Sequence, residues 1–171
     1  LGAVNSINWA RVAAQVVYYV TAAVALGAPD RQVSFSVPTG NFGNVLAADV
    51  ARRMGVPIAQ LIIASNENDI LTRTVETGTM SIEDVQPTTS PSMDIQVSSN
   101  FERLLFDLYD GNGLALGEDM VEFRASGRLT LAPAVHRALC QRFDAGRLTQ
   151  PEVLDLIAAQ YRADGTLVEP H

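Results

Sequence analysis

The chain has 171 residues, a formal net charge of −7 and 47% hydrophobic residues, which favours one compact domain or one large piece of a longer protein. The negative charge argues against a nucleic-acid-binding surface, and no apolar run reaches the roughly 18–20 residues that a membrane span needs. The single cysteine, Cys140, excludes an internal disulfide and fits a reducing compartment, so we expect a cytoplasmic protein.

The N-terminal part of the chain predicts helices that alternate with strands. In order, the hydrophobic pattern indicates a helix from a cap at Asn5 or Ser6 to Leu26, a strand at 33–37, a helix at 45–54 and a strand at 58–64. The first helix is apolar over most of its circumference, so we expect it to be buried. The second strand is almost wholly apolar, which is typical of a parallel sheet covered on both faces. Two strands joined by a helix form a βαβ unit, and the predicted fold class is α/β.

Beyond the second strand, the pattern predicts only helices and one long loop. A helix capped by Asn68 or Asp69 reaches about Glu76, and the loop is rich in Ser, Thr and Pro. Further helices are predicted at 101–110, 117–125, 133–143 and from a capping box at Thr149 to about Gly165. We therefore divide the chain into an α/β part at 1–80, a loop or boundary at 81–99 and a mainly helical part at 100–171.

The connector between the first strand and the second helix, Thr39-Gly-Asn-Phe-Gly-Asn44, contains more turn-forming residues than a connector needs. In an α/β sheet, ligands bind where the carboxyl ends of the strands meet such connectors. Glycines leave backbone N–H groups uncovered by side chains, and the start of the next helix adds further free N–H groups. These donors suit an anion, most naturally a phosphate group. Phe42 either covers one face of a planar ligand or anchors the turn.

A plain tight turn is the alternative, because Gly and Asn are ordinary turn formers. The Gly-x-x-Gly spacing matches neither the dinucleotide-binding fingerprint nor the Walker loop, which also needs a lysine. A small phosphorylated cofactor therefore fits this turn better than NAD or a nucleoside triphosphate.

Four segments of the chain are distinctive as a set. They are V-N-S-I-N-W-A-R from Val4, V-P-T-G-N-F-G-N from Val37, A-S-N-E-N-D-I-L-T-R from Ala64 and S-P-S-M-D-I-Q-V-S-S-N-F-E-R from Ser90. Together they resemble threonine synthase. The order and spacing of these segments match the family, and the resemblance runs from Val4 to His171.

The resemblance implies a pyridoxal-phosphate enzyme of the tryptophan-synthase-β-like fold, also called fold type II. Such enzymes convert O-phospho-L-homoserine and water to L-threonine and phosphate. In that family the Gly-Asn-Phe-Gly-Asn turn binds the phosphate of pyridoxal 5′-phosphate. The resemblance places this role on Gly40, Asn41, Phe42, Gly43 and Asn44.

The family's Schiff-base lysine lies upstream, in a Ser-Phe-Lys-Asp-like context that has no counterpart here. All twelve basic residues of the chain are arginine, so this chain alone cannot supply the lysine. The residue that contacts the pyridine nitrogen in the family also lies beyond His171, and the chain starts at Leu1 without an initiator methionine. We therefore expect an internal or proteolysed fragment that holds no catalytic residue and is inactive in isolation.

Several other polar residues have both a functional and a structural interpretation. The first group stands at the start of the first helix and either contacts the substrate or caps the helix: Asn5, Ser6, Asn8 and Arg11. The second group follows the second strand and either lines the site or serves as a cap and an ion pair: Asn66, Asn68, Asp69 and Arg73. The third group lies in the last family-like segment, where we favour a helix cap by Asn100 and a surface arginine: Ser98, Ser99, Asn100 and Arg103.

No metal site is predicted. His136 and Cys140 are four residues apart on one helix, but two candidate ligands are too few. We expect His136 at the surface and Cys140 as a buried thiol.

Two alternatives to threonine synthase stay open at the level of sequence. One is another enzyme of the same fold, such as a serine or threonine dehydratase. The other is a non-catalytic domain that binds a phosphorylated metabolite without reacting it.

Overall fold

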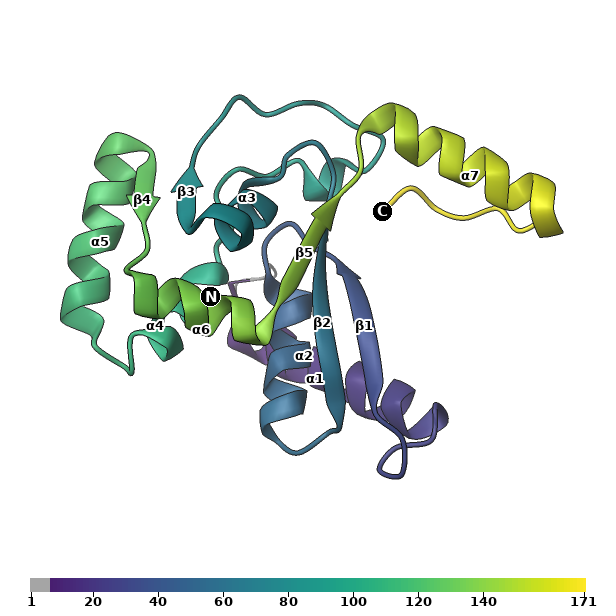
Figure 1. The fold of residues 1–171 in the computed structure, drawn as a ribbon, viewed down its shortest axis with the longest axis horizontal. Coiled ribbons are helices and arrows are strands. Elements are labelled where there is room, and N and C mark those ends of the chain that lie inside the picture. Colours follow the sequence, from purple (N-terminus) through teal and green to yellow (C-terminus); the bar gives the residue numbers. More distant parts are fainter. Residues whose placement is uncertain (1–6) are drawn as a thin grey trace.

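The structure is a computed structural model that describes residues 7–171 (Figure 1). Its elements in chain order are α1 (Trp9–Ala25), β1 (Val33–Pro38), α2 (Gly43–Arg53), β2 (Ile58–Ser65), α3 (Ile70–Thr77), β3 (Thr79–Ser81), the 3-10 turn η1 (Pro91–Met93), α4 (Phe101–Leu108), α5 (Gly113–Ser126), β4 (Arg128–Thr130), α6 (Pro133–Arg142), β5 (Asp144–Arg147) and α7 (Gln150–Asp164). None of the helices in this range combines the length and the hydrophobicity of a membrane span.

The main sheet has three parallel strands in the order β1, β2, β5. Val37 of β1 lies opposite Ile63 of β2, and Ile63 lies opposite Ala145 of β5. The predicted α/β class with a parallel βαβ core is confirmed. The strands β3 and β4 form a separate antiparallel pair beside α5, on the side of the molecule away from α7 (Figure 1).

The expectation of helices alone after residue 100 is wrong at β4 and β5. β5 has the sequence Asp-Ala-Gly-Arg, which has neither β-branched residues nor an alternating pattern, so its conformation comes from pairing with β2 rather than from local propensity. The helix predicted at 117–125 begins earlier, at Gly113, because Asn112 caps it by accepting a hydrogen bond from the Ala115 N–H.

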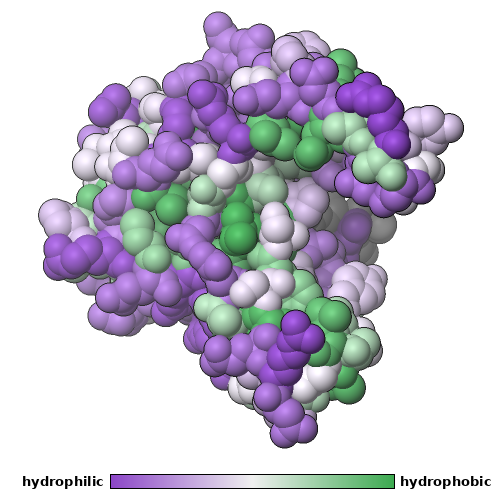
Figure 2. All heavy atoms as spheres, turned by 45° about the vertical axis from the view of Figure 1, so that its right-hand side comes forward, coloured by the Kyte–Doolittle hydropathy of each residue, from purple (hydrophilic) through white to green (hydrophobic). Residues whose placement is uncertain are grey.

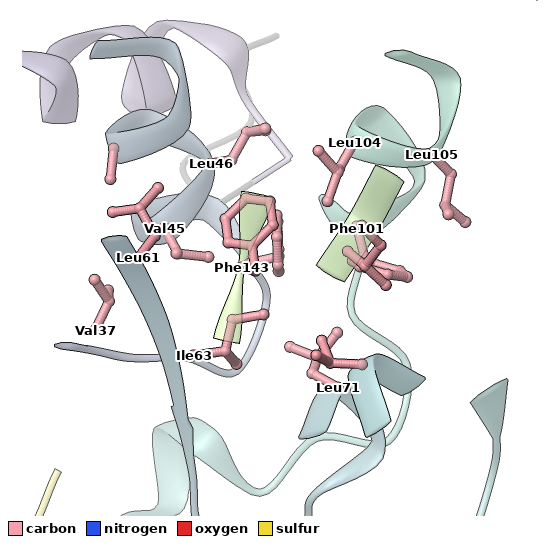
Figure 3. Packing of buried hydrophobic residues seen from close by; sticks show 14 of the residues in the cluster. Val37, Val45, Leu46, Leu61, Ile63, Leu71, Phe101, Leu104, Leu105 and Phe143 are labelled. Carbon is pink, nitrogen blue, oxygen red and sulfur yellow. The ribbon is translucent and has the colours of Figure 1, made fainter. Parts of the chain in front are cut away.

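One face of the sheet holds the core. Figure 3 shows Phe143, which precedes β5, packed between the sheet residues Leu61 and Ile63 and the α4 residue Phe101. All four of these side chains are buried. α2 covers the same region with the buried side chains Val45, Leu46, Ala47, Ala48 and Ala51.

The opposite face of the sheet is not covered as the sequence predicts. Ile62 and Ala64 of β2 are only half-buried, and with Ser36 of β1 they line an apolar hollow of about 530 Å³ beneath α7. Figure 2, which turns the α7 side forward, shows hydrophobic residues gathered around a hollow on this face. Within residues 7–171, the apolar side chains of β2 are therefore buried on one face of the sheet and only half-buried or exposed on the other.

α1 is also less buried than expected. It packs on α2 through Val12, Val16, Tyr19 and Ala23, which recur at helical spacing. On the other side Val17, Tyr18 and Val24 are exposed, Tyr18 by 62%. The cap is Asn8, whose Oδ1 accepts from the Ala10 N–H at 3.0 Å, whereas the expected caps Asn5 and Ser6 lie outside the described residues.

α7 projects from the body of the molecule (Figure 1). It opens with the predicted capping box, in which Glu152 accepts from the Thr149 N–H at 2.7 Å. None of its residues is buried among the described part of the chain, and Leu154, Leu156 and Tyr161 are exposed.

Candidate functional site

The connector singled out by the sequence lies at the carboxyl edge of the main sheet. The Thr39 N–H, directly after β1, donates to the Ala64 carbonyl near the end of β2 at 2.9 Å. The Leu148 N–H, directly after β5, donates to the Ser65 carbonyl at 3.2 Å. The connector therefore lies where three strands end together, which is the usual position of a ligand site in this class of fold.

A hollow of about 430 Å³ opens onto the connector. Its lining residues come from α1, the end of β1, the connector, η1 and the end of the described chain: Gln15, Pro38, Thr39, Gly40, Asn41, Phe42, Gly43, Asn44, Ser92, Met93 and His171. All five residues of the predicted phosphate turn thus share one cavity wall.

The backbone donors of this turn are unused. Within residues 7–171, the N–H groups of residues 40–45 have no hydrogen-bond acceptor. The residue before α2, Phe42, has no side chain that can cap the helix, so the first amides of α2 stay available. A row of free N–H groups at a positive helix end is a site for an anion.

The backbone carbonyls of the same turn are, in contrast, firmly held. The Ser98 hydroxyl donates to the Gly40 carbonyl at 2.8 Å. The Asn41 carbonyl accepts from both the backbone N–H of Asn100, at 3.1 Å, and its side-chain Nδ2, at 3.0 Å. Asn100 occupies the N-cap position of α4, but its side chain makes no cap hydrogen bond. The expected local cap is therefore a long-range contact to the turn.

Phe42 anchors the turn rather than covering a ligand. Its side chain is 1% exposed and packs edge-on against Phe101 and Phe143, with ring centroids 5.1 and 5.5 Å away. Its φ of 64° lies in the left-handed region, which a residue with a side chain rarely adopts. The buried ring holds the backbone in a conformation that exposes the following amides.

Gly40 is required by close packing rather than by its φ angle. A Cβ built on it would lie 2.9 Å from the Ser92 carbonyl oxygen and 3.2 Å from the Met93 Cα. Both neighbours are backbone atoms of η1, which cannot move away as the end of a side chain can. The turn is thus packed tightly onto η1.

Two residues of α1 belong to the site although the sequence does not single them out. Tyr19 donates from its hydroxyl to Oδ1 of Asn44, which leaves Nδ2 of Asn44 as the free donor end of that amide. Gln15, one turn earlier, lines the hollow, and its buried Oε1 has no partner among the described residues. The only local signal for Gln15 is its polar side chain beside the apolar stripe of α1.

Raising the pH should test the Tyr19 contact. Burial raises the pKa of Tyr19 to about 12, above its usual value near 10, so the folded state holds the proton more tightly than the unfolded state. This contribution to stability is complete below about pH 10 and is lost as the pH rises through about 12. We expect the free energy of unfolding in urea to fall less steeply over this range in Tyr19→Phe than in wild type.

Part of the fall should remain in Tyr19→Phe, because burial and then Asp119 raise the pKa of Tyr109 as well. The Phe35 ring, 5.0 Å from that of Tyr19, still has an aromatic neighbour in the variant. Parallel pH curves for the two proteins would show that Tyr19 does not contribute.

The predicted substrate group at the start of α1 is not brought to this hollow within the described residues. Asn8 caps α1, Arg11 is exposed, and neither lines the hollow. Asn5 and Ser6 lie outside the described residues.

The group after β2 mainly holds the long loop. Asn66 donates through Nδ2 to Thr88, Ser90 and Asp94, and Asn68 accepts from the Gln86 N–H at 2.9 Å. Burial opposes ionisation of Asp94, but hydrogen bonds from Thr88 and then Asn66 outweigh it and lower the pKa of this carboxyl. The loop is therefore ordered by side chains from the carboxyl edge of the sheet.

Asp69 and Arg73 form the ion pair that the structural interpretation favours. Arg73 lies 2.8 Å from Asp69 and 2.9 Å from Glu83, and Asp69 also pairs with Arg147 at 2.9 Å. Asp69 occupies the N-cap position of α3 without a side-chain cap hydrogen bond.

The pair on α6 has no ligand-binding geometry. His136 is half-buried, with Nε2 2.7 Å from the Val75 carbonyl, and Cys140 points to the same carbonyl at 3.3 Å. Cys140 is exposed, so the prediction of a buried thiol is wrong. No group of three or more metal-binding side chains occurs within residues 7–171.

No protein-family model matches the chain. Comparison with individual proteins finds threonine synthases that are similar to it over almost all of its length. The threonine synthase of Pseudomonas aeruginosa is 50% identical over 171 residues, which are 100% of this chain and 36% of that protein. A crystal structure of PLP-bound threonine synthase from Brucella melitensis is 54% identical, with a TM-score of 0.97, over 100% of this chain and 37% of that one. Yeast threonine synthase is 37% identical, with a TM-score of 0.93, over 99% of this chain and 36% of that one.

The chain therefore spans little more than a third of the length of these relatives. Over its whole length, this chain is a homologue of one segment of threonine synthase.

Proposed function

We propose that the turn at Gly40, Asn41, Phe42, Gly43 and Asn44 binds the phosphate group of pyridoxal 5′-phosphate. The observation that supports this most is the row of unpaired N–H groups at residues 40–45, because residues 40–44 line a cavity of about 430 Å³. Phosphate oxygens accept hydrogen bonds and carry negative charge, so the donor set and the helix end fit the group. The related threonine synthase from Brucella melitensis is described as PLP-bound.

Each residue of the turn then has a definable task. The backbone N–H groups donate to the phosphate oxygens, and the dipole of α2 stabilises the negative charge. Asn44 adds the Nδ2 donor that Tyr19 leaves free. The Phe42 ring fixes the position of this assembly in the core. The cofactor, when bound, supplies an electron sink for chemistry at the substrate carbons.

We further propose that this chain forms the corresponding part of a cytoplasmic threonine synthase. The complete enzyme converts O-phospho-L-homoserine and water to L-threonine and phosphate. This chain contributes the phosphate site and one wall of the pocket, and the lysine that bonds to the cofactor comes from elsewhere, because the chain contains none. The 50% identity to a threonine synthase over the whole chain favours this reaction over that of a dehydratase of the same fold.

A comparison of the 171-residue chain with a protein of the length of its relatives tests this proposal. The longer protein should release phosphate and L-threonine from O-phospho-L-homoserine, measured by coupled phosphate detection and amino-acid analysis. The short chain should do neither. After incubation with pyridoxal 5′-phosphate and borohydride reduction, peptide mapping should find no labelled side chain in it, since only the α-amine at Leu1 can react.

Two outcomes would redirect the assignment. A longer protein that forms a keto acid from threonine or serine would be a dehydratase. A longer protein that binds pyridoxal 5′-phosphate without turnover of any of these substrates would be a binding module.

A further inference from the structure

The Gly40 and Asn41 carbonyls are bonded by a segment far away in sequence. Ser98 Oγ lies 2.8 Å from the Gly40 carbonyl, and Asn100 Nδ2 lies 3.0 Å from the Asn41 carbonyl. Ser98 and Asn100 are buried, Asn100 completely, and neither lines the hollow at the turn. These two side chains therefore contact the turn from a side that does not line the hollow.

The planar peptide bond links the direction of each of these carbonyls to the direction of the next residue's N–H group. In a trans peptide, the carbonyl of one residue and the N–H of the next point in opposite directions. A Gly40 carbonyl held by Ser98 therefore directs the Asn41 N–H away from Ser98, and an Asn41 carbonyl held by Asn100 directs the Phe42 N–H likewise. Both N–H groups lack an acceptor among the described residues, and both residues line the hollow.

We propose that Ser98 and Asn100 are positioning residues for the phosphate site, which fix two N–H donors of the turn toward the phosphate. The inference rests on the proposed function of the turn. Without the Ser98 hydroxyl, the peptide unit 40–41 can rotate, and without the Asn100 side chain, the unit 41–42 is held only by the Asn100 backbone N–H. A turn that must be ordered on binding has a lower affinity. Ser99 does not share the role, because its hydroxyl contacts the Asn41 side chain, at 3.3 Å.

The experiment measures the affinity of the longer protein for pyridoxal 5′-phosphate and for pyridoxal, which lacks the phosphate. Ser98→Ala should weaken binding of the phosphorylated ligand about five- to tenfold, which corresponds to one lost hydrogen bond. Pyridoxal binding should stay unchanged, and inorganic phosphate should compete less well in the variant. Ser98→Thr, which keeps the hydroxyl, should retain the wild-type preference.

Thr74→Val is the matched control. Thr74 is fully buried and donates its hydroxyl to a backbone carbonyl, that of Ile70, at 2.6 Å, but it lies on α3 away from the turn. Its loss should lower the unfolding temperature as Ser98→Ala does, without changing the preference for the phosphorylated ligand. The pair separates a positioning effect from a general loss of stability.

The possible failures are distinguishable. A wild-type protein that binds both ligands equally well would overturn the proposed phosphate site together with this inference. A wild-type protein that prefers the phosphorylated ligand, with a Ser98→Ala variant that keeps the full preference, would overturn this inference alone. Asn100→Leu removes the side-chain donor to the Asn41 carbonyl without leaving a large void, but the backbone N–H of residue 100 still donates to that carbonyl. This variant should therefore lose part of the phosphate preference, less than Ser98→Ala does, and a full preference would refute the role of the Asn100 side chain.

Discussion

Phe42→Ala should lower the free energy of unfolding of this chain by about 3–5 kcal/mol, the usual cost of removing a buried aromatic side chain. Phe42 is 1% exposed and makes edge-on contacts with Phe101 and Phe143, each of which adds stabilisation beyond simple burial. Alanine does not relieve the backbone, because it too disfavours the left-handed conformation at this position. Urea unfolding followed by circular dichroism measures the effect.

Phe106→Ala is the matched control for this substitution. Phe106 lies on α4 and, unlike Phe42, is 45% exposed, so its loss should cost less than about 1 kcal/mol. Similar losses in the two variants would mean that Phe42 does not anchor the turn in the core. The contrast would also separate the two interpretations of Phe42 that the sequence leaves open.

Gly40→Ala should destabilise the chain by about 1–3 kcal/mol, although the substitution adds only one methyl group. The new Cβ would approach the Ser92 carbonyl oxygen to 2.9 Å and the Met93 Cα to 3.2 Å. Because both are backbone atoms, the connector and η1 must separate, which also disturbs the wall of the hollow. Thermal unfolding measures the stability, and equilibrium dialysis measures the binding of pyridoxal 5′-phosphate.

Gly117→Ala provides a control of opposite sign. Gly117 lies inside α5, and a Cβ built there meets no atom within 4 Å. Alanine at this position should stabilise the chain by about 0.5–1 kcal/mol, because it restricts the unfolded state and favours the helix. If Gly40→Ala stabilised the protein in the same way, the close packing of the turn on η1 would be refuted.

The parts of the fold with a strong local pattern were predictable from sequence. The strands at 33–37 and 58–64 and the helix between them have the hydrophobic period and the punctuation that such elements need. The position of the turn followed from them, because a βαβ unit places its connector at the carboxyl edge of the sheet. The capping box at Thr149 has an equally local cause.

The remaining features depend on contacts that local sequence does not encode. β5 is a strand only because β2 pairs with it. The Asn100 side chain could cap α4, yet it donates to the Asn41 carbonyl, and no pattern around Asn100 distinguishes the two. Gln15 and Tyr19 reach the site because α1 packs on α2, which is a property of the tertiary fold.

The exposed apolar residues of α1 and the open face of β2 also could not be predicted from periodicity alone. An apolar strand or helix indicates that it will be covered, but not by which part of a protein. Within residues 7–171, each of the two elements is covered on one side only.

The long reach from Ser98 and Asn100 back to the turn has a consequence for biosynthesis. These contacts join residues 58 and 59 positions apart, and a ribosome adds only about 5–20 residues each second. During translation, the turn is therefore made several seconds before the segment that contains Ser98 and Asn100. Over this interval its carbonyls lack these two hydrogen-bond donors. A chain truncated before Ser98 would therefore keep the recognisable motif at residues 39–44 but would lack the two side chains that bond its carbonyls.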